Sequence, residues 1–180
     1  MNIERGLFFD GGFIRPLGIE DVYDGYIVGL NDSVVNRYLE VRHEYQSEQS
    51  VARFVENNQK SADAVLFGIW LKDQDHHCGT VRLHEISLTE KSAYIGICIF
   101  DKKSWGQGLG TKSISTVTKW ALDGLGLLKI EAGAYADNIA SQKAFLNAGY
   151  EWTHDIQGKY IFESKPVTVK IFAARSQSNL

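Results

Sequence analysis

The chain has little of what several classes of protein require. Its 180 residues contain only two cysteines, Cys78 and Cys98. Both lie in strand-like runs, so we expect two buried thiols rather than a disulfide, and a reducing compartment fits this usage. His76 and His77 precede Cys78, but no second Cys/His pair matches them. An ordinary turn and strand start is therefore favoured over a metal site, and we expect no metal.

Two further absences concern charge and hydrophobic runs. The net charge of −3 leaves no basic excess to meet nucleic-acid phosphates. No apolar run reaches the roughly 18 residues of a membrane span. The first residues include the acidic Glu4 and Asp10 and contain no signal-like apolar stretch. We therefore expect a cytoplasmic protein that binds neither nucleic acid nor membrane.

The composition that is present is typical of a folded domain. Hydrophobic residues make up 44% of the chain and charged residues 23%. A domain of this length buries about 70% of its unfolded surface, so its core does not require disulfides or a bound metal for stability. No repeats or linkers occur. We expect one domain spanning residues 1–180, with a polar, frayed tail at residues 175–180.

The hydrophobic pattern predicts a run of strands followed by alternating strands and helices. Strands are expected at residues 13–17, 64–71, 78–87, 93–100, 129–135, near 152–154 and at 167–174. Helices are expected at residues 20–30, 49–60 and 110–122, and after Asn138. The strands before residue 101 should form an antiparallel meander. This order indicates a mixed α/β or α+β sheet covered by helices.

The most informative segment is rich in glycine and reads Trp105-Gly106-Gln107-Gly108-Leu109-Gly110-Thr111-Lys112-Ser113. It follows a buried strand-like run and precedes a helix. Glycine lets the backbone approach a ligand and adopt φ > 0, and the free N–H groups of a first helical turn favour phosphate oxygens. Thr111 stands where a P-loop and a dinucleotide-binding fingerprint both require glycine. The segment alone indicates either an anion-binding loop or a tight strand-to-helix connection.

A second segment favours the anion-binding interpretation. Residues 138–150 predict a helix with Asn138 as N-cap and Gly149 just beyond its end. Asn138, Ser141 and Phe145 are spaced three and four apart and share one face. With the glycine segment upstream, this helix resembles the GNAT superfamily of acetyl-CoA-dependent N-acetyltransferases. That superfamily carries a Q/R-x-x-G-x-G/A loop followed by an N-x-x-A/S-x-x-x-Y helix. The Trp-Gly-Gln-Gly order is most similar to the branch with ribosomal-protein N-terminal and amino-sugar acetyltransferases.

The resemblance implies both a fold and a cosubstrate. The implied fold is a mixed, mostly antiparallel central sheet of about seven strands flanked by about four helices, splayed open beside the loop. Acetyl-CoA would place its pyrophosphate on the backbone N–H groups of the loop and its pantetheine arm beside the preceding strand. The implied cofactor-binding residues are Ile97, Cys98, Ile99, Trp105, Gly106, Gln107, Gly108, Leu109, Gly110, Thr111, Asn138, Ser141 and Phe145.

The chain departs from the family pattern at the positions that move protons. Phe145 stands where many members have the tyrosine that protonates the departing thiolate, and Tyr94 stands where many have a glutamate. Tyr94 is a poor base at neutral pH, but it is a candidate acid. His84 and Glu85 are candidate bases, of which at most one should face the cleft because neighbouring strand residues alternate. Glu131 is a third candidate, and a water chain is a fourth. Each of these side chains alone is more often structural or on the surface.

These observations favour an N-acetyltransferase that acts on a primary amine. By resemblance, the strand at residues 79–86 and the segment 129–145 are most similar to acetyltransferases that act on a small-molecule acceptor, a nucleotide-linked amino sugar for surface polysaccharide. The runner-up is N-terminal protein or peptide acetylation. The occupied acid and base positions keep a third class open, a non-catalytic module that binds acyl-CoA. The oligomeric state stays open, with a homodimer as one option because many relatives pair.

Overall fold

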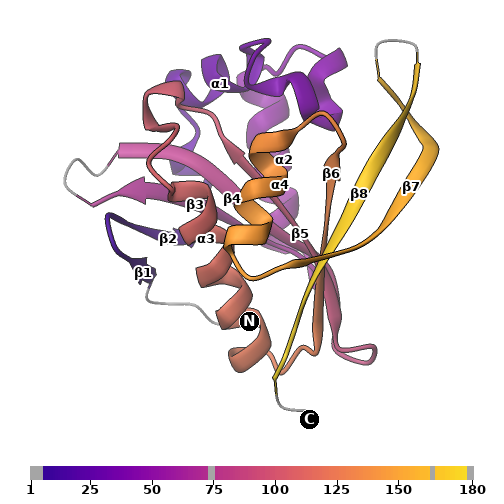
Figure 1. Ribbon diagram of the computed structural model, residues 1–180. Coiled ribbons are helices and arrows are strands. Elements are labelled where there is room, and N and C mark those ends of the chain that lie inside the picture. The colour runs from indigo at the N-terminus through magenta and orange to yellow at the C-terminus, as the bar shows by residue number, and fades with distance from the viewer. Residues whose placement is uncertain (1–5, 73–75, 163–164, 178–180) are drawn as a thin grey trace.

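The computed structural model describes residues 6–72, 76–162 and 165–177. These residues form one eight-stranded sheet in the order β1-β2-β3-β4-β5-β6-β8-β7 (Figure 1). The strands are β1 (Leu7–Phe9), β2 (Gly12–Pro16), β3 (Val65–Leu71), β4 (His76–Ser87), β5 (Ser92–Ile99), β6 (Lys129–Tyr135), β7 (Glu151–Phe162) and β8 (Lys165–Arg175). All neighbouring pairs are antiparallel except β5 and β6. The expected mixed, mostly antiparallel sheet is confirmed, and β1 is the strand that the sequence pattern did not predict.

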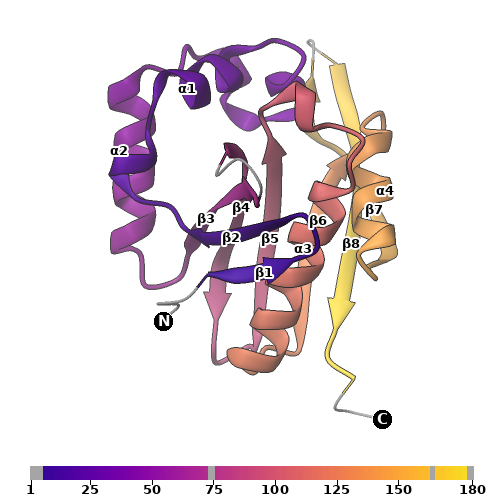
Figure 2. The ribbon, with the colours of Figure 1, turned by 90° about the vertical axis from the view of Figure 1, so that its left-hand side faces the viewer.

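Four α-helices cover this sheet in the part of the chain that the structure describes. They are α1 (Asp24–Asn31), α2 (Glu48–Lys60), α3 (Leu109–Lys119) and α4 (Ile139–Asn147). Helices α3 and α4 pack on one face, and α1 and α2 pack on the other (Figure 2). None of these described helices is long and apolar enough to cross a membrane.

The central strands are hydrophobic on both faces because each face has its own core. On β3, Phe67 and Ile69 belong to the core under α3 and α4, whereas Leu66 and Trp70 belong to the core under α1 and α2. Side chains alternate along a strand, so a strand with helices on both sides needs a nearly continuous apolar run. The run Val65–Leu71 meets that requirement.

The start of α1 differs from the sequence prediction of a helix at residues 20–30. The carboxylate of Asp21 accepts a hydrogen bond from the Gly18 N–H and forms an ion pair with Arg15 at 2.6 Å. These local bonds stabilise a short 3₁₀ turn, η1 (Ile19–Asp21), and α1 begins only at Asp24. Side-chain bonding to nearby backbone competes with helix formation in this way. Helix α2 begins at Glu48, one residue before the predicted start, and Ser47 Oγ caps it by accepting from the Ser50 N–H.

The sheet opens between β5 and β6. In the described residues these strands pair in parallel only over Ser92–Tyr94 and Lys129–Glu131, and they diverge beyond that point (Figure 1). The opening lies beside the glycine segment that leads into α3. On the far side of β6, Arg175 still pairs with Lys129, and the Ser176 N–H donates to the Leu128 carbonyl at 3.0 Å. The last residues of the expected tail, 178–180, lie outside the described part of the chain.

Candidate active site

A cleft of about 960 Å³ opens where β5 and β6 diverge. It is lined from one face of the sheet by the glycine loop, the first turn of α3 and one side of α4. From the other face it is lined by residues 34–40. The predicted cofactor residues that line it are Ile97, Cys98, Ile99, Trp105, Gly106, Gly108, Leu109, Gly110, Thr111, Asn138, Ser141 and Phe145. Gln107 is not among the lining residues, and its Nε2 donates to the Lys103 carbonyl at 3.0 Å.

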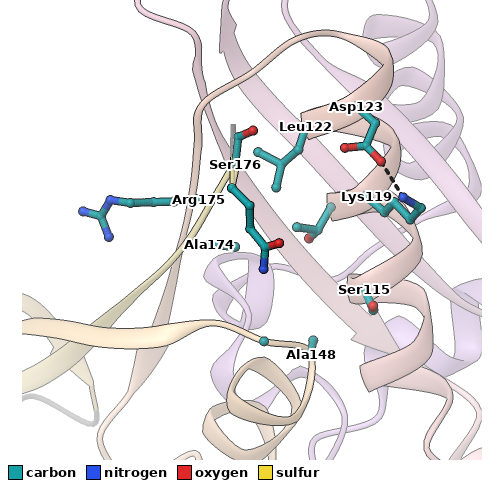
Figure 3. A pocket seen from close by; sticks show the side chains of 11 residues that line it. Ser115, Lys119, Leu122, Asp123, Ala148, Ala174, Arg175 and Ser176 are labelled. Carbon is teal, nitrogen blue, oxygen red and sulfur yellow. Dashed lines mark hydrogen bonds and ion pairs between the residues drawn. The ribbon is translucent and has the colours of Figure 1, made fainter. Parts of the chain in front are cut away.

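A second, smaller hollow of about 330 Å³ lies at the other end of α3 (Figure 3). Its charged groups include the exposed, hydrogen-bonded ion pair of Lys119 with Asp123 on one helical surface. Thr118 lines it as well, and its hydroxyl is already hydrogen-bonded to the buried Tyr150 hydroxyl at 2.7 Å. The larger cleft is therefore the better candidate for chemistry.

The glycine loop offers backbone amides with open space above them. Gly106 and Gly108 have φ of +75° and +74°, and a Cβ added to either would meet nothing within 4 Å. Gly108 is the N-cap of α3, so no side chain caps that helix, and its first turn contains no acidic residue. The first N–H groups of α3 therefore lack intrahelical acceptors, and the helix dipole makes an anion favourable there.

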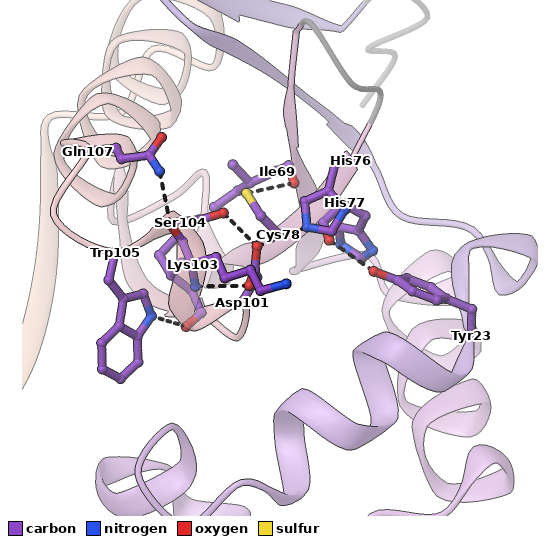
Figure 4. A network of polar contacts seen from close by, with 11 residues as sticks. Tyr23, Ile69, His76, His77, Cys78, Asp101, Lys103, Ser104, Trp105 and Gln107 are labelled. Atoms are coloured by element: carbon purple, nitrogen blue, oxygen red, sulfur yellow. Dashed lines mark hydrogen bonds and ion pairs between the residues drawn. The ribbon is translucent and has the colours of Figure 1, made fainter.

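A polar network holds the loop in place (Figure 4). Asp101 accepts from Ser104 Oγ at 2.8 Å, from the Lys103 N–H at 3.0 Å, and contacts His76 Nε2 at 2.9 Å. Burial opposes ionisation of Asp101, but the hydrogen bonds from Ser104 and His76 outweigh it and lower the pKa of this carboxyl. The Trp105 indole N–H donates to the Ile99 carbonyl at 2.8 Å and so ties the loop to the end of β5.

Lys112, in the first turn of α3, is held away from the cleft. Its Nζ donates to the backbone carbonyl of Asp10 at 2.8 Å and forms an ion pair with the Asp10 carboxylate at 2.9 Å. The lysine thus joins α3 to the turn between β1 and β2. Backbone amides of the loop, rather than this side chain, are therefore the groups placed to meet an anion in the cleft.

Helix α4 presents its predicted face to the cleft. Asn138 is its N-cap, and its side-chain oxygen accepts from the Ser141 N–H at 3.2 Å. Gly149 follows the helix with φ of +90°, as expected of a residue just beyond a helix end. Phe145 is 1% exposed and packs against Tyr150 and Phe172, so its ring is part of the core as well as of the cleft wall.

The candidate acid and bases gather where β5 and β6 still pair. His84 lies opposite Tyr94 on neighbouring strands with their rings stacked at 6.0 Å, and Tyr94 is in register with Glu131. The expectation that at most one of His84 and Glu85 faces the cleft stays a prediction, but the regular strand alternation behind it is interrupted at Glu85. Glu85 has φ of +52°, in a bulge that brings its carboxylate within 3.5 Å of His84 Nδ1. Burial lowers the pKa of His84. None of these four described side chains lines the cleft, and their catalytic roles stay predictions.

One pair of cleft residues had no signal in the sequence. Glu40 lies in the 3₁₀ turn η3 (Glu40–His43), and Tyr135 ends β6. The Tyr135 hydroxyl donates to Glu40 Oε1 at 2.9 Å. Arg42, from the same turn, stands 5.7 Å from the Tyr135 ring and donates to the Ile161 carbonyl at 3.1 Å. Burial, and then the hydrogen bond to Glu40, raise the pKa of Tyr135.

Sequence comparison matches this chain to a known family. The profile of the acetyltransferase (GNAT) domain matches residues 13–151, which includes the glycine loop and α4. The chain belongs to the GNAT acetyltransferase family. It is 27% identical over 139 residues to the uncharacterized N-acetyltransferase YoaA of Bacillus subtilis, covering 77% of this chain and 78% of the relative. It is 28% identical over 146 residues to the probable N-acetyltransferase YjcK of the same organism, covering 77% and 79%. The protein is therefore an acetyl-CoA-dependent N-acetyltransferase.

Solved structures of GNAT proteins share the fold of this acetyltransferase. RimL, a ribosomal L7/L12 α-N-protein acetyltransferase in complex with coenzyme A, superposes with a TM-score of 0.83 at 18% identity, over 95% of this chain and 98% of that one. A spermidine N-acetyltransferase from Vibrio cholerae, in complex with CoA and spermine, superposes with a TM-score of 0.82 at 17% identity, over 93% and 96%. Among the described residues no group of three or more His, Cys, Asp or Glu side chains is placed to hold a metal ion.

Proposed function

We propose that this acetyltransferase binds acetyl-CoA along the cleft and transfers the acetyl group to the primary amine of a small acceptor. The best candidate for that acceptor is a nucleotide-linked amino sugar. One observation carries the donor half of the proposal. The uncapped N-terminus of α3 opens into the same cleft as the end of β5 that has left β6. A diphosphate followed by an amide-rich arm matches these two backbone surfaces.

The open edge of β5 suits the pantetheine arm. Beyond Tyr94 this strand has no partner on the β6 side among the described residues, so its backbone groups can pair with amides of a ligand as an added strand would. Gly96, on that edge, leaves open space where a side chain would otherwise stand. The Ile99 carbonyl already accepts from Trp105, so we place the backbone pairing at residues 96–98.

The reaction moves one acyl group and one proton. The amine nitrogen attacks the thioester carbonyl carbon, the carbon–sulfur bond breaks, the amine loses a proton and the thiolate gains one. A backbone N–H of β5 is our candidate donor to the developing oxyanion. Phe145 has no hydroxyl to protonate the thiolate. Tyr94 remains our candidate acid, and His84 and Glu85 remain our candidate bases. These side chains lie together on β4 and β5, at the point where β5 stops pairing with β6.

The acceptor side of the cleft favours a small ligand with both ionic and aromatic parts. Arg37 and Tyr38 line it, with the guanidinium 5.4 Å from the tyrosine ring, and Lys143 lines the same cleft from α4 on the opposite side. Cations and an aromatic ring suit the phosphates and base of a nucleotide. RimL and the Vibrio spermidine acetyltransferase are named for protein and polyamine acceptors, so a peptide N-terminus and a polyamine are the alternatives.

A panel of amines tests this proposal. Thiol release from acetyl-CoA would be followed with nucleotide amino sugars, free amino sugars, spermidine, aminoglycosides and short peptides with free N-termini. We expect turnover with the nucleotide amino sugars and little with peptides. Turnover only with peptides or only with spermidine would contradict the sugar assignment. Tight CoA binding without turnover of any amine would instead favour a binding module.

The cofactor loop can be tested separately with a pair of glycine variants. Gly108→Glu places a carboxylate over the first amides of α3, where it repels phosphate, so we expect CoA affinity measured by calorimetry to fall by at least about 100-fold. Gly126→Glu is the matched control, because Gly126 also has a positive φ (+69°) and open space around it but does not line the cleft. Equal CoA affinity in the two variants would refute the loop assignment.

A further inference from the structure

The cleft contains a single acidic side chain among its described lining residues, that of Glu40. Aliphatic and aromatic groups make up much of the wall around it, including Val34, Val35 and Leu39 from the same segment. Glu40 is exposed in the structure, and a ligand that fills the cleft would take water from its carboxylate, which is costly unless a cation or hydrogen-bond donors replace that water. Glu40 therefore marks a place where a cationic ligand would be stabilised.

The carboxylate of Glu40 is held at one oxygen. Tyr135 is 8% exposed, and its hydroxyl donates to Oε1 of Glu40 at 2.9 Å. The ring of Tyr135 is itself held, because the ring of Tyr38 lies 5.9 Å away and the guanidinium of Arg42 lies 5.7 Å away. Within the described residues, Tyr135 is the hydrogen-bond partner of the Glu40 carboxylate. No second donor to this carboxylate is found in the described part of the chain, so Oε2 can receive an N–H from a ligand.

Glu40 also lies on the side of the sheet that the donor does not occupy. The glycine loop, α3 and α4 approach the cleft from one face. Val35, on the segment that carries Glu40, packs against the core of the opposite face. The opening between β5 and β6 connects the two faces. An amine that enters from the Glu40 side would therefore meet an acyl group presented from the loop side.

We infer that Glu40 binds the ammonium group of the acceptor amine and that Tyr135 is a positioning residue that orients the Glu40 carboxylate. This inference rests on the proposed function and adds to it a requirement on the acceptor, which must approach as a cation. A primary alkyl or sugar amine meets that requirement at neutral pH. The amine must release its proton before it attacks the thioester, so Glu40 determines amine binding and orientation rather than the chemical step.

The test compares four variants, Glu40→Gln, Glu40→Asp, Tyr135→Phe and Glu44→Gln, with the wild-type protein. Glu40→Gln keeps the size of the side chain and removes its charge, and Tyr135→Phe removes the orienting hydroxyl. Glu44→Gln removes a charge four residues away on an exposed residue outside the cleft lining, and is the matched control. Each would be assayed by thiol release with the amine from the panel above that the wild-type protein acetylates best. CoA affinity would be measured in parallel by calorimetry.

We expect Glu40→Gln to raise the KM for the amine by about 10- to 100-fold, since a charge-assisted hydrogen bond is lost. CoA affinity should be unchanged. Tyr135→Phe should raise the same KM by a smaller factor, Glu40→Asp should restore part of the loss, and Glu44→Gln should behave as the wild type. An unchanged amine KM in Glu40→Gln, with wild-type turnover present, would overturn the role of Glu40 and leave the proposed function standing. Absence of wild-type turnover with every amine would overturn both.

Discussion

His77 is a buried histidine outside the cleft lining, and its burial should make the stability of the fold depend on pH. It is 5% exposed and enclosed by the rings of Tyr26, Trp70 and Phe100. Nε2 is hydrogen-bonded to the Gly79 carbonyl at 3.0 Å, and Nδ1 has no partner in the described part of the structure. Burial lowers the pKa of His77 from 6.5 to about 4, and the nearby Asp21 opposes this only in part. The folded protein therefore holds this imidazole neutral.

Acid should destabilise the fold through this histidine. Above pH 6.5 the imidazole is neutral in both states, so its full contribution is present. As the pH falls from 6.5 to about 4, the unfolded state binds a proton that the folded state does not. Over this interval the free energy of unfolding should drop by about 3 kcal/mol. Urea unfolding at a series of pH values, compared between wild type and His77→Phe, measures the effect. Equal pH slopes, or an NMR titration of His77 near 6.5, would contradict it.

At the scale of the helix, Asn138 has two roles that can be separated. As N-cap of α4 it accepts from the Ser141 N–H, and it also lines the cleft. Asn138→Ala should lower the free energy of unfolding by about 1 kcal/mol because the cap is lost. Asn138→Asp keeps an accepting oxygen at the cap and should keep the stability. It replaces the amide donor with a negative charge, so we expect weaker CoA binding. Denaturant unfolding and calorimetry on both variants make the measurement. If Asn138→Asp binds CoA as the wild type does, Asn138 acts only as a cap.

At the scale of the whole molecule, the cleft exists because β5 and β6 diverge after a short paired stretch. The amides of Gly96–Ile99 and of Gly106–Lys112 belong to elements brought together there, and a ligand lying along both should protect both from exchange. We therefore expect CoA to slow hydrogen exchange in these two segments together. The exchange rate of peptides from α2, which packs on the face of the sheet opposite α3, should stay unchanged. Mass spectrometry with and without CoA tests this. Protection of the glycine loop alone would mean that the pantetheine arm does not follow β5.

Local signals account for much of what the sequence predicted. Gly106 and Gly108 act through local backbone freedom, and Asn138 acts through capping of the next helical turn. These effects extend over only a few residues, so the sequence alone predicts the loop and the start of the helix. The same reasoning misplaced the start of α1. There, the ion pair of Arg15 with Asp21 formed a competing turn. It also treated His84 and Glu85 as neighbours on opposite faces, whereas a bulge brought their side chains into contact.

The sequence by itself determined the family, the strand and helix order and the glycine loop. Each of these depends on hydrophobic periodicity or on backbone preferences that act over a few positions. The tertiary structure alone decided where the cleft opens and which side chains meet in it. Glu40 and Tyr135 are separated by 95 positions and come together only because β6 diverges from β5 and η3 packs over the opening. Contacts of that kind depend on how whole elements pack, and no local pattern in the chain encodes them.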